Sequence, residues 1–159
     1  ITWSLVGSEM CIRDSFGLVG FSFACGLGVK LAKPKKTVVS LMGDGGFGMT
    51  ISELSTAVEH KINTITIVMN NKSWGAEKAY QKDFFGKRYL GADISSPPFD
   101  KVAELYGAKG YKVKKLSEIN DTLKSALKVN KPVVIEIDVD PKALYSFRKD
   151  SFKNKLNAN

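Results

Sequence analysis

The sequence has few cysteines, a single histidine and no long apolar run. Its two cysteines, Cys11 and Cys25, form no CxxC pair, so we expect free thiols in a reducing compartment and place the protein in the cytoplasm. No apolar stretch approaches the roughly 18 residues of a membrane-spanning helix. The chain does not open with a basic region, an apolar core and a cleavage site, so no secretion signal is expected. A membrane protein and a secreted protein are both disfavoured.

The chain is long enough for one domain with a proper core, since it has 159 residues of which 43% are hydrophobic. Its net charge is +8, which would suit a nucleic-acid-binding protein. However, no aromatic ladder or known nucleic-acid motif accompanies the lysines, and they gather in predicted turns and helix ends. We therefore expect a solvated basic surface that favours small anionic substrates, and no nucleic-acid partner. The clusters are Lys30, Lys33, Lys35 and Lys36; Lys109, Lys112, Lys114 and Lys115; and the tail after Arg148.

A glycine-rich turn, residues 43–48, lies between a predicted strand and a predicted helix. Residues 37–42 are apolar and rich in β-branched side chains, which is typical of a buried strand. Residues 49–60 carry apolar side chains at nearly helical spacing. A turn that opens a helix directs free backbone N–H groups and the positive end of the helix dipole at one point, and this arrangement suits a phosphate.

A second strand is predicted over residues 64–69, and it ends at Asn70 and Asn71. In a parallel sheet the carboxyl ends of both strands lie at one edge, where α/β proteins bind ligands. Asp44 and Asn71 would then place a carboxylate and an amide oxygen side by side. Two such oxygens beside a phosphate site are what Mg²⁺ bound to a diphosphate needs.

Two other interpretations of the turn compete with this one. Gly43, Gly45 and Gly48 satisfy the G-x-G-x-x-G pattern of dinucleotide-binding folds. That fold needs an acidic residue at the end of the next strand, where this chain has Asn70 and Asn71, and it rarely has an aspartate between its first two glycines. The other alternative is a tight turn with no ligand. The magnesium–diphosphate interpretation explains more of the residues.

Gly43-Asp44-Gly45 followed by Asn70-Asn71 resembles the cofactor signature of thiamine-diphosphate-dependent enzymes. The resemblance implies that Asp44, the Asn71 side chain and the Ser73 carbonyl bind Mg²⁺, and that Gly45 and Gly46 face the diphosphate of thiamine diphosphate. It implies no catalytic residue in this chain. The full set of cofactor-binding residues expected from the resemblance is Gly17, Leu18, Val19, Gly43, Asp44, Gly45, Gly46, Asn71, Ser73, Trp74 and Gly75.

Gly17-Leu18-Val19-Gly20 is similar to a turn that precedes a helix in the same family. There the first glycine carbonyl accepts a hydrogen bond from the aminopyrimidine, and an apolar side chain holds the cofactor in its bent shape. Val19, in the second role, is smaller than the usual methionine, leucine or isoleucine. Two roles are open for Trp74: it is either a core residue or a wall of the active site.

Strands and helices alternate along the remaining chain, which predicts an α/β fold with a doubly wound parallel sheet, the thiamine-diphosphate-binding fold. Residues 1–15 fit no pattern, and we expect a foreign or truncated segment there rather than a genuine linker. Residues 16–140 form the expected cofactor-binding domain, and residues 141–159 a basic tail. The further predicted elements are helices over 21–32, 72–81, 99–106 and 116–129, strands over 110–113 and 132–139, and a loop over 84–98.

Residues 70–78, 83–84, 88–91 and 146–150 are most similar to sulfoacetaldehyde acetyltransferases, which convert sulfoacetaldehyde and phosphate to acetyl phosphate and sulfite. The wider pattern, including residues 46–50, is shared with acetolactate synthases. In the family, a glutamate on a pyrimidine-binding domain of the same or a neighbouring subunit activates the cofactor. We expect this chain to be the C-terminal part of such an enzyme, homo-oligomeric and silent alone. The alternatives are the β subunit of a two-chain 2-oxoacid decarboxylase and a nucleotide- or nucleic-acid-binding module.

Overall fold

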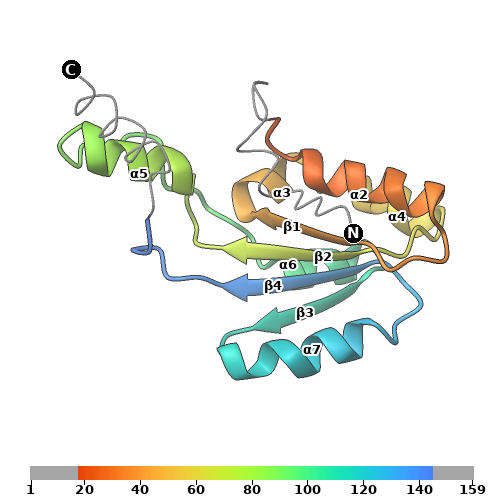
Figure 1. Ribbon diagram of the computed structural model, residues 1–159. Helices are drawn as coiled ribbons and strands as arrows, with labels where there is room; N and C mark the ends of the chain where they lie inside the picture. The colour runs from red at the N-terminus through yellow and green to blue at the C-terminus, as the bar shows by residue number, and fades with distance from the viewer. Residues whose placement is uncertain (1–17, 145–159) are drawn as a thin grey trace, which may run out of the picture.

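The computed structural model describes residues 18–144, and their helices and strands alternate along the chain (Figure 1). The strands are β1 (Val39–Gly43), β2 (Ile65–Asn70), β3 (Lys109–Val113) and β4 (Val133–Asp138). The α-helices are α2 (Phe21–Ala32), α3 (Asp44–Thr50), α4 (Glu53–Glu59), α5 (Gly75–Phe84), α6 (Phe99–Leu105) and α7 (Ile119–Ala126), and a 3₁₀ helix, η1 (Leu116–Glu118), precedes α7.

The strands form one 4-stranded parallel sheet in the order β1-β2-β4-β3. Because all strands run the same way, their carboxyl ends share one edge, at the arrowheads in Figure 1. Gly43 at the end of β1 is paired with Met69, one residue before the end of β2. The register therefore places Asp44 beside the start of the Asn70-Asn71 turn.

Helices cover both faces of the sheet, which confirms the predicted doubly wound α/β fold. Alternate residues of a strand point to opposite faces, and the two apolar clusters follow this alternation. Val68 and Val134 lie in one cluster with side chains of α2, α3, α4 and α6. Ile65 and Ile135 lie in the other, against α7. The middle of β4 is buried on both faces, as expected for a central parallel strand.

Three phenylalanines from separate helices form the centre of the first cluster. Phe47 of α3 is fully buried, and its ring makes edge-to-face contacts with Phe23 and Phe99, with 5.2 Å between centroids in each pair. Such aromatic pairs add to the free energy gained from apolar burial alone. Phe47 thereby fixes α3 over the sheet and, with it, the glycine-rich turn at the start of that helix.

Three predicted helices differ from the structure. The helix predicted over residues 72–81 is α5, which begins only at Gly75 and continues to Phe84. The helix predicted over residues 49–60 begins instead at Asp44, and a turn at Ile51 and Ser52 divides it into α3 and α4. The helix predicted over residues 116–129 is a 3₁₀ turn followed by α7, which ends at Ala126. The glycine turn thus belongs to a helix. Between α3 and α4 the chain winds more tightly, as the bonds from Leu54 N–H to Ile51 C=O and from Ser55 N–H to Ser52 C=O show.

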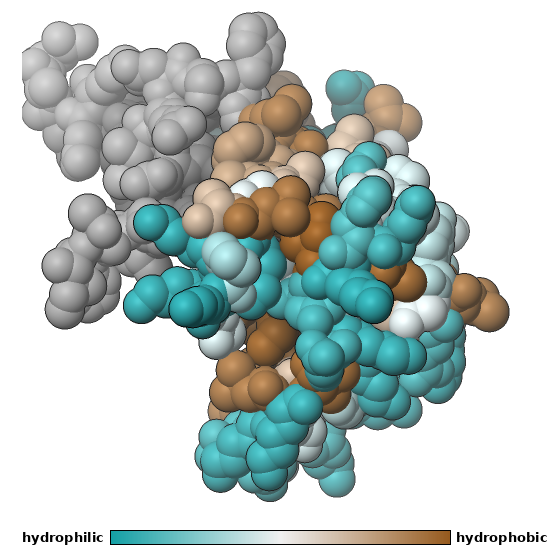
Figure 2. Space-filling view, turned by 90° about the vertical axis from the view of Figure 1, so that its right-hand side faces the viewer, coloured by the Kyte–Doolittle hydropathy of each residue, from teal (hydrophilic) through white to brown (hydrophobic). Residues whose placement is uncertain are grey.

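Hydrophilic side chains dominate the face at the amino ends of the strands, which Figure 2 views directly. Lys30, Lys61 and Lys131 lie around a hollow there. Each helix within residues 18–144 is too short or too polar to cross a bilayer. Residues 1–17 and 145–159 lie outside the described part, and so do the predictions made for them.

Replacing Phe47 with alanine should remove the central ring of the three-ring contact. We expect Phe47→Ala to lower the free energy of unfolding by about 3–5 kcal/mol, because it combines lost apolar burial with a cavity. Urea unfolding followed by circular dichroism measures the change. Met49→Ala on the same helix is the control: Met49 is 63% exposed, so a change within about 0.5 kcal/mol is expected. Equal effects of the two substitutions would contradict the assigned packing.

Candidate cofactor and metal site

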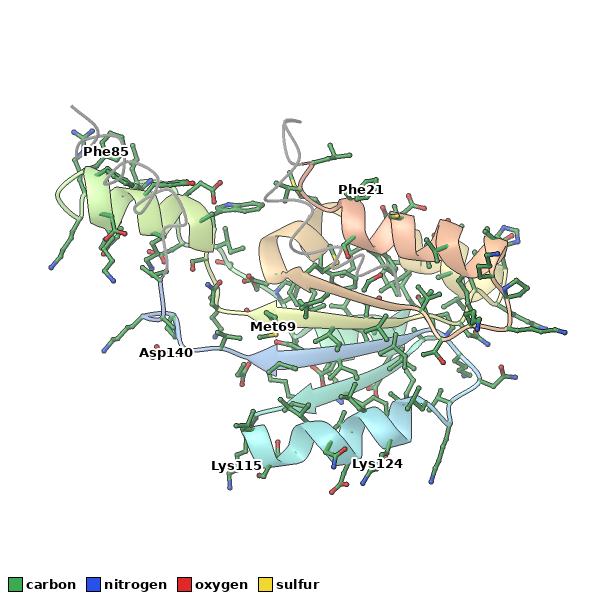
Figure 3. All side chains as sticks on the ribbon, in the orientation of Figure 1. Phe21, Met69, Phe85, Lys115, Lys124 and Asp140 are labelled. Atoms are coloured by element: carbon green, nitrogen blue, oxygen red, sulfur yellow. The ribbon has the colours of Figure 1, made fainter. Side chains whose placement is uncertain are left out.

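The predicted site residues converge on a cleft of about 370 Å³ at the carboxyl edge of the sheet. Met69, labelled in Figure 3, marks the β2 side of this edge. Leu18 is 70% exposed and does not line the cleft, and Gly17 lies outside the described residues. The predicted residues that do line it are Val19, Gly43, Asp44, Gly45, Gly46, Asn71, Ser73, Trp74 and Gly75.

Asp44 is a buried carboxylate, only 2% exposed, at the first position of α3. Its Oδ2 accepts a hydrogen bond from Ser96 Oγ at 2.5 Å. Within residues 18–144, no lysine, arginine or histidine forms an ion pair with it. A buried carboxylate without a counter-ion is costly, so this position favours a bound cation.

The turn after β2 presents polar groups to the same cleft. Asn71 Oδ1 accepts a hydrogen bond from the Ser73 N–H at 3.1 Å, and Asn70 Oδ1 accepts one from the Lys72 N–H at 3.1 Å. Lys72 has a φ of 55°, in the left-handed region that non-glycine residues rarely adopt. Ser73 is 3% exposed, and its Oγ is buried with no hydrogen-bond partner in the described part of the chain. Neighbouring side chains therefore hold the turn in an uncommon conformation.

These oxygen groups suit magnesium better than a metal that prefers histidine or cysteine. No cluster of three or more histidine, cysteine, aspartate or glutamate side chains that could hold a metal is found in residues 18–144. One carboxylate with neutral oxygen ligands and a phosphate is a usual environment for Mg²⁺. The Asp44 carboxylate, the Asn71 amide and the neighbouring Ser73 main chain fit that description.

At two glycines of the turn, a side chain would come close to neighbouring atoms. A Cβ built on Gly45 would lie 2.5 Å from Trp74 Cζ3, and one built on Gly46 would lie 3.4 Å from the Gly20 nitrogen and 3.5 Å from Val19 Cγ1. The backbone N–H groups in the first turn of α3 have no partners within the helix. The Trp74 ring covers Gly45 and is one wall of the cleft.

The segment 92–96 was predicted only as part of a long loop, yet it contributes directly to the site. It runs antiparallel to residues 72–74: the Trp74 N–H bonds to the Ala92 carbonyl at 2.8 Å, and the Ile94 N–H bonds to the Lys72 carbonyl at 3.1 Å. This pairing brings Ser96 to Asp44. Nothing in the sequence around Ser96 indicates such a contact, because it depends on a loop returning to a distant turn.

Glu136 on β4 is a second buried carboxylate, and sequence analysis assigned it no role. It accepts hydrogen bonds from Asn70 Nδ2 at 2.6 Å, from Lys112 Nζ at 2.6 Å and from the Asp100 N–H at 3.3 Å. Burial alone would raise the pKa of the Glu136 carboxyl. The three hydrogen bonds and the Lys112 charge outweigh burial, so this pKa lies below its ordinary value of 4.5. The signal in the sequence that could have indicated a role for Glu136 is its position as a charged residue inside the apolar run 133–137.

The same hydrogen bonds shift the pKa of Lys112 in the opposite direction, upwards. Burial lowers the pKa of its ammonium group, but hydrogen bonds to Asp138 and Glu136 and their charges outweigh this effect and leave the pKa raised above 10.5. Glu136 and Lys112 are therefore an ion pair at neutral pH. In contrast to Asp44, the Glu136 carboxylate has its counter-ion within residues 18–144.

A larger hollow of about 480 Å³ lies at the opposite edge of the sheet and contains none of the predicted residues. It is lined by Lys30, Lys61 and Lys131 among others, and no carboxylate from residues 18–144 lines it. The basic cluster around Lys30 therefore lies at the far end of the strands from Asp44. It cannot be part of the cleft that the glycine turn forms.

Comparison with known proteins agrees with the glycine turn, the Asn70-Asn71 turn and the cleft between them. The family model "Thiamine pyrophosphate enzyme, C-terminal TPP binding domain" matches residues 5–137. The chain belongs to this family, whose cofactor is thiamine diphosphate, with Mg²⁺ as its usual partner. Recognition of the family from the Gly-Asp-Gly and Asn-Asn motifs is thereby confirmed.

Individual relatives within this family have more than one activity. The chain is 36% identical over 146 residues to a sulfoacetaldehyde acetyltransferase of Castellaniella defragrans, covering 89% of this chain and 24% of the relative. It is 40% identical over 126 residues to an acetolactate synthase large subunit of Haemophilus influenzae, covering 78% and 22%. The chain thus spans about a quarter of the length of these relatives.

A solved structure has the same fold. It is a thiamine diphosphate-dependent 4-hydroxybenzoylformate decarboxylase of Rhodococcus jostii, with a TM-score of 0.73 and 31% sequence identity. The match covers 78% of this chain and 24% of that one. The relatives and this structure share the cofactor domain and differ in the reactions that their names describe.

Gly45→Ala tests the contact between the turn and Trp74. Helix propensity alone would favour alanine by about 1 kcal/mol, but the new methyl group would collide with the ring, so we expect a net loss of about 1–3 kcal/mol. In a Trp3→Phe background, the fluorescence of Trp74 should also shift. Gly48→Ala is the matched control, because a Cβ there meets nothing within 4 Å. A stabilised Gly45→Ala variant would contradict the described contact.

Proposed function

We propose that the cleft holds the diphosphate of thiamine diphosphate together with Mg²⁺. In this proposal Asp44, the Asn71 amide oxygen and the Ser73 carbonyl bind the metal, and the backbone of Gly45 and Gly46 contacts the diphosphate. Gly43, Trp74 and Gly75 shape the walls, and Val19 contacts the organic part of the cofactor. Gly17 and Leu18 complete the expected set.

The observation that carries this proposal is the buried Asp44 carboxylate without a cationic partner among the described residues. A divalent ion would supply the missing positive charge, and the diphosphate would complete its ligands. Asn71 and Ser73 line the same cleft as Asp44, and glycines leave the adjacent backbone accessible. A dinucleotide would leave the Asp44 charge facing a pyrophosphate with no metal between them.

Thiamine diphosphate supplies a nucleophilic carbon and an electron sink for breaking and forming bonds next to a carbonyl group. The residues of this chain would bind and orient it, and Asp44 would hold its charged end through the metal. Activation is assigned to a glutamate of a pyrimidine-binding domain, on the same or a neighbouring subunit. The 159 residues are therefore expected to bind the cofactor without turnover.

For the whole enzyme we propose cleavage of sulfoacetaldehyde with transfer of the acetyl group to phosphate. Its support is the similarity to sulfoacetaldehyde acetyltransferases at 36% and 34% identity over 146 residues. Acetolactate synthesis is the second candidate, since one synthase is 40% identical over a shorter span. The third candidate is that this chain is the β subunit of a two-chain 2-oxoacid decarboxylase.

Titration calorimetry with thiamine diphosphate and Mg²⁺ tests the cofactor proposal. We expect binding that requires the metal and that Asp44→Ala weakens by more than about 100-fold, because even outer-shell ligand changes cost 10–100-fold. Asp121→Asn, at an exposed position paired with Lys124, should bind like the wild type. Tighter binding of NAD or single-stranded DNA, or binding unaffected by Asp44→Ala, would overturn the proposal.

Product analysis tests the activity. The enzyme that carries the pyrimidine-binding domain should release sulfite from sulfoacetaldehyde in the presence of phosphate, whereas the 159 residues alone should not. Acetolactate formed from pyruvate, without sulfite release, would select the second candidate. Turnover by the 159 residues alone would refute the division of roles between the two domains.

A further inference from the structure

Glu136 is buried in the centre of the sheet and does not line the cofactor cleft. It is 1% exposed, on the strand that lies between β2 and β3. Its register partners are Val68 on β2 and Lys112 on β3. Lys112 balances its charge. The carboxylate also accepts hydrogen bonds from the Asn70 side chain and from the backbone N–H of Asp100, at the start of α6. Its position connects the body of the sheet to the turn after β2.

The carboxylate determines which way the Asn70 amide faces. An ionised carboxylate can only accept hydrogen bonds, whereas a side-chain amide has one accepting and one donating end. Asn70 must therefore turn its NH₂ group to Glu136, where the distance is 2.6 Å. Its oxygen then faces the opposite way and accepts the Lys72 N–H at 3.1 Å.

The fixed amide in turn holds the backbone of the turn. Lys72 has a left-handed conformation that is unfavourable for a residue with a side chain, so the turn needs bonds that hold it in place. The Lys72 N–H bond is one, and the bond from the Ser73 N–H to Asn71 Oδ1 is the next. Asn71 and Ser73, the residues assigned to the metal, lie on either side of Lys72.

We propose that Glu136 is a positioning residue for the metal-binding turn: through the Asn70 amide it holds Lys72, and thereby sets where Asn71 and Ser73 present their oxygens. The assignment of a metal to this turn rests on the proposed function. The hydrogen-bond chain from Glu136 to the Lys72 N–H is independent of it. Lys112 and the Asp100 N–H keep the carboxylate charged and in place.

Glu136→Gln tests the proposal because it keeps the shape of the side chain but leaves one accepting oxygen for three donors and removes the charge, so the Asn70 NH₂ group loses its charged acceptor. Two quantities are measured: exchange of the Lys72 amide hydrogen by NMR without cofactor, and the Mg²⁺ dissociation constant by calorimetry with saturating thiamine diphosphate. We expect exchange to be about tenfold faster and the dissociation constant to rise at least about tenfold. Val134→Ala, a cavity on the same face of β4, is the control for lost stability alone and should leave both unchanged.

Asn70→Ala removes the link from its other end and supports the test if Glu136→Gln folds poorly. It should reproduce both effects, and adding Glu136→Gln to it should change neither quantity further, since the two residues act through one bond. Normal Lys72 exchange in Glu136→Gln, matching effects of Val134→Ala, or additive effects in the double variant would overturn the proposal. Absence of Mg²⁺-dependent binding in the wild type would instead refute the proposed function, and Lys72 exchange would still decide whether Glu136 holds the turn.

Discussion

A carboxylate that is buried at the end of β1 without a counter-ion among the described residues is the constraint around which the site is arranged. Burying Asp44 costs free energy, and among residues 18–144 the Ser96 hydroxyl donates the side-chain hydrogen bond that reduces this cost. The position is imposed by the pairing of β1 with β2, which brings Asp44 to the turn at Asn70. It is maintained by Phe47, whose packing fixes the helix that Asp44 begins. The parallel sheet and the aromatic core thus hold a charged group where a metal would be most strongly attracted.

The sequence predicted the fold well because the strands carry strong local signals. Runs of β-branched residues identified β1, β2 and β4, and α2 was predicted with its observed bounds. The start of α3 was missed because glycine disfavours a helix by about 1 kcal/mol per residue, so periodicity suggested a start at Met49. Met49 is in fact exposed, and it is the packing of Phe47 that forms the helix through Gly45, Gly46 and Gly48.

The site was predicted where its residues lie at strand ends, and missed where they come from elsewhere. Asp44 and Asn71 follow their strands directly, so parallel topology was enough to bring them to one edge. Ser96 reaches Asp44 only through the pairing of a loop with residues 72–74, which no local pattern encodes. Glu136 had a signal, since a lone charge in a buried strand requires partners, but its partners on β2 and β3 depend on strand order.

The positive charge of the chain is divided between the two edges of the sheet. The cluster around Lys30 and Lys61 lies at the amino ends of the strands, where Figure 2 shows a mostly hydrophilic face. At the carboxyl edge, Lys112 is neutralised by Glu136 and Asp138, and Lys78 by Asp93. A bound metal and the backbone of the glycine turn would therefore add to the attraction of anions to the cleft. The net charge of the chain describes the solvent-facing surface better than the site.

The backbone pairing between residues 72–74 and 92–96 has a dynamic consequence. Main-chain bonds at Trp74 and Ile94 join the two segments, and Ser96 joins the second of them to Asp44. The loop cannot move outwards while the turn stays intact, because this movement would break the hydrogen bond from the Ser96 hydroxyl to the buried Asp44 carboxylate. The two segments should consequently fluctuate as one cooperative unit, so that order gained at either of them is gained at both.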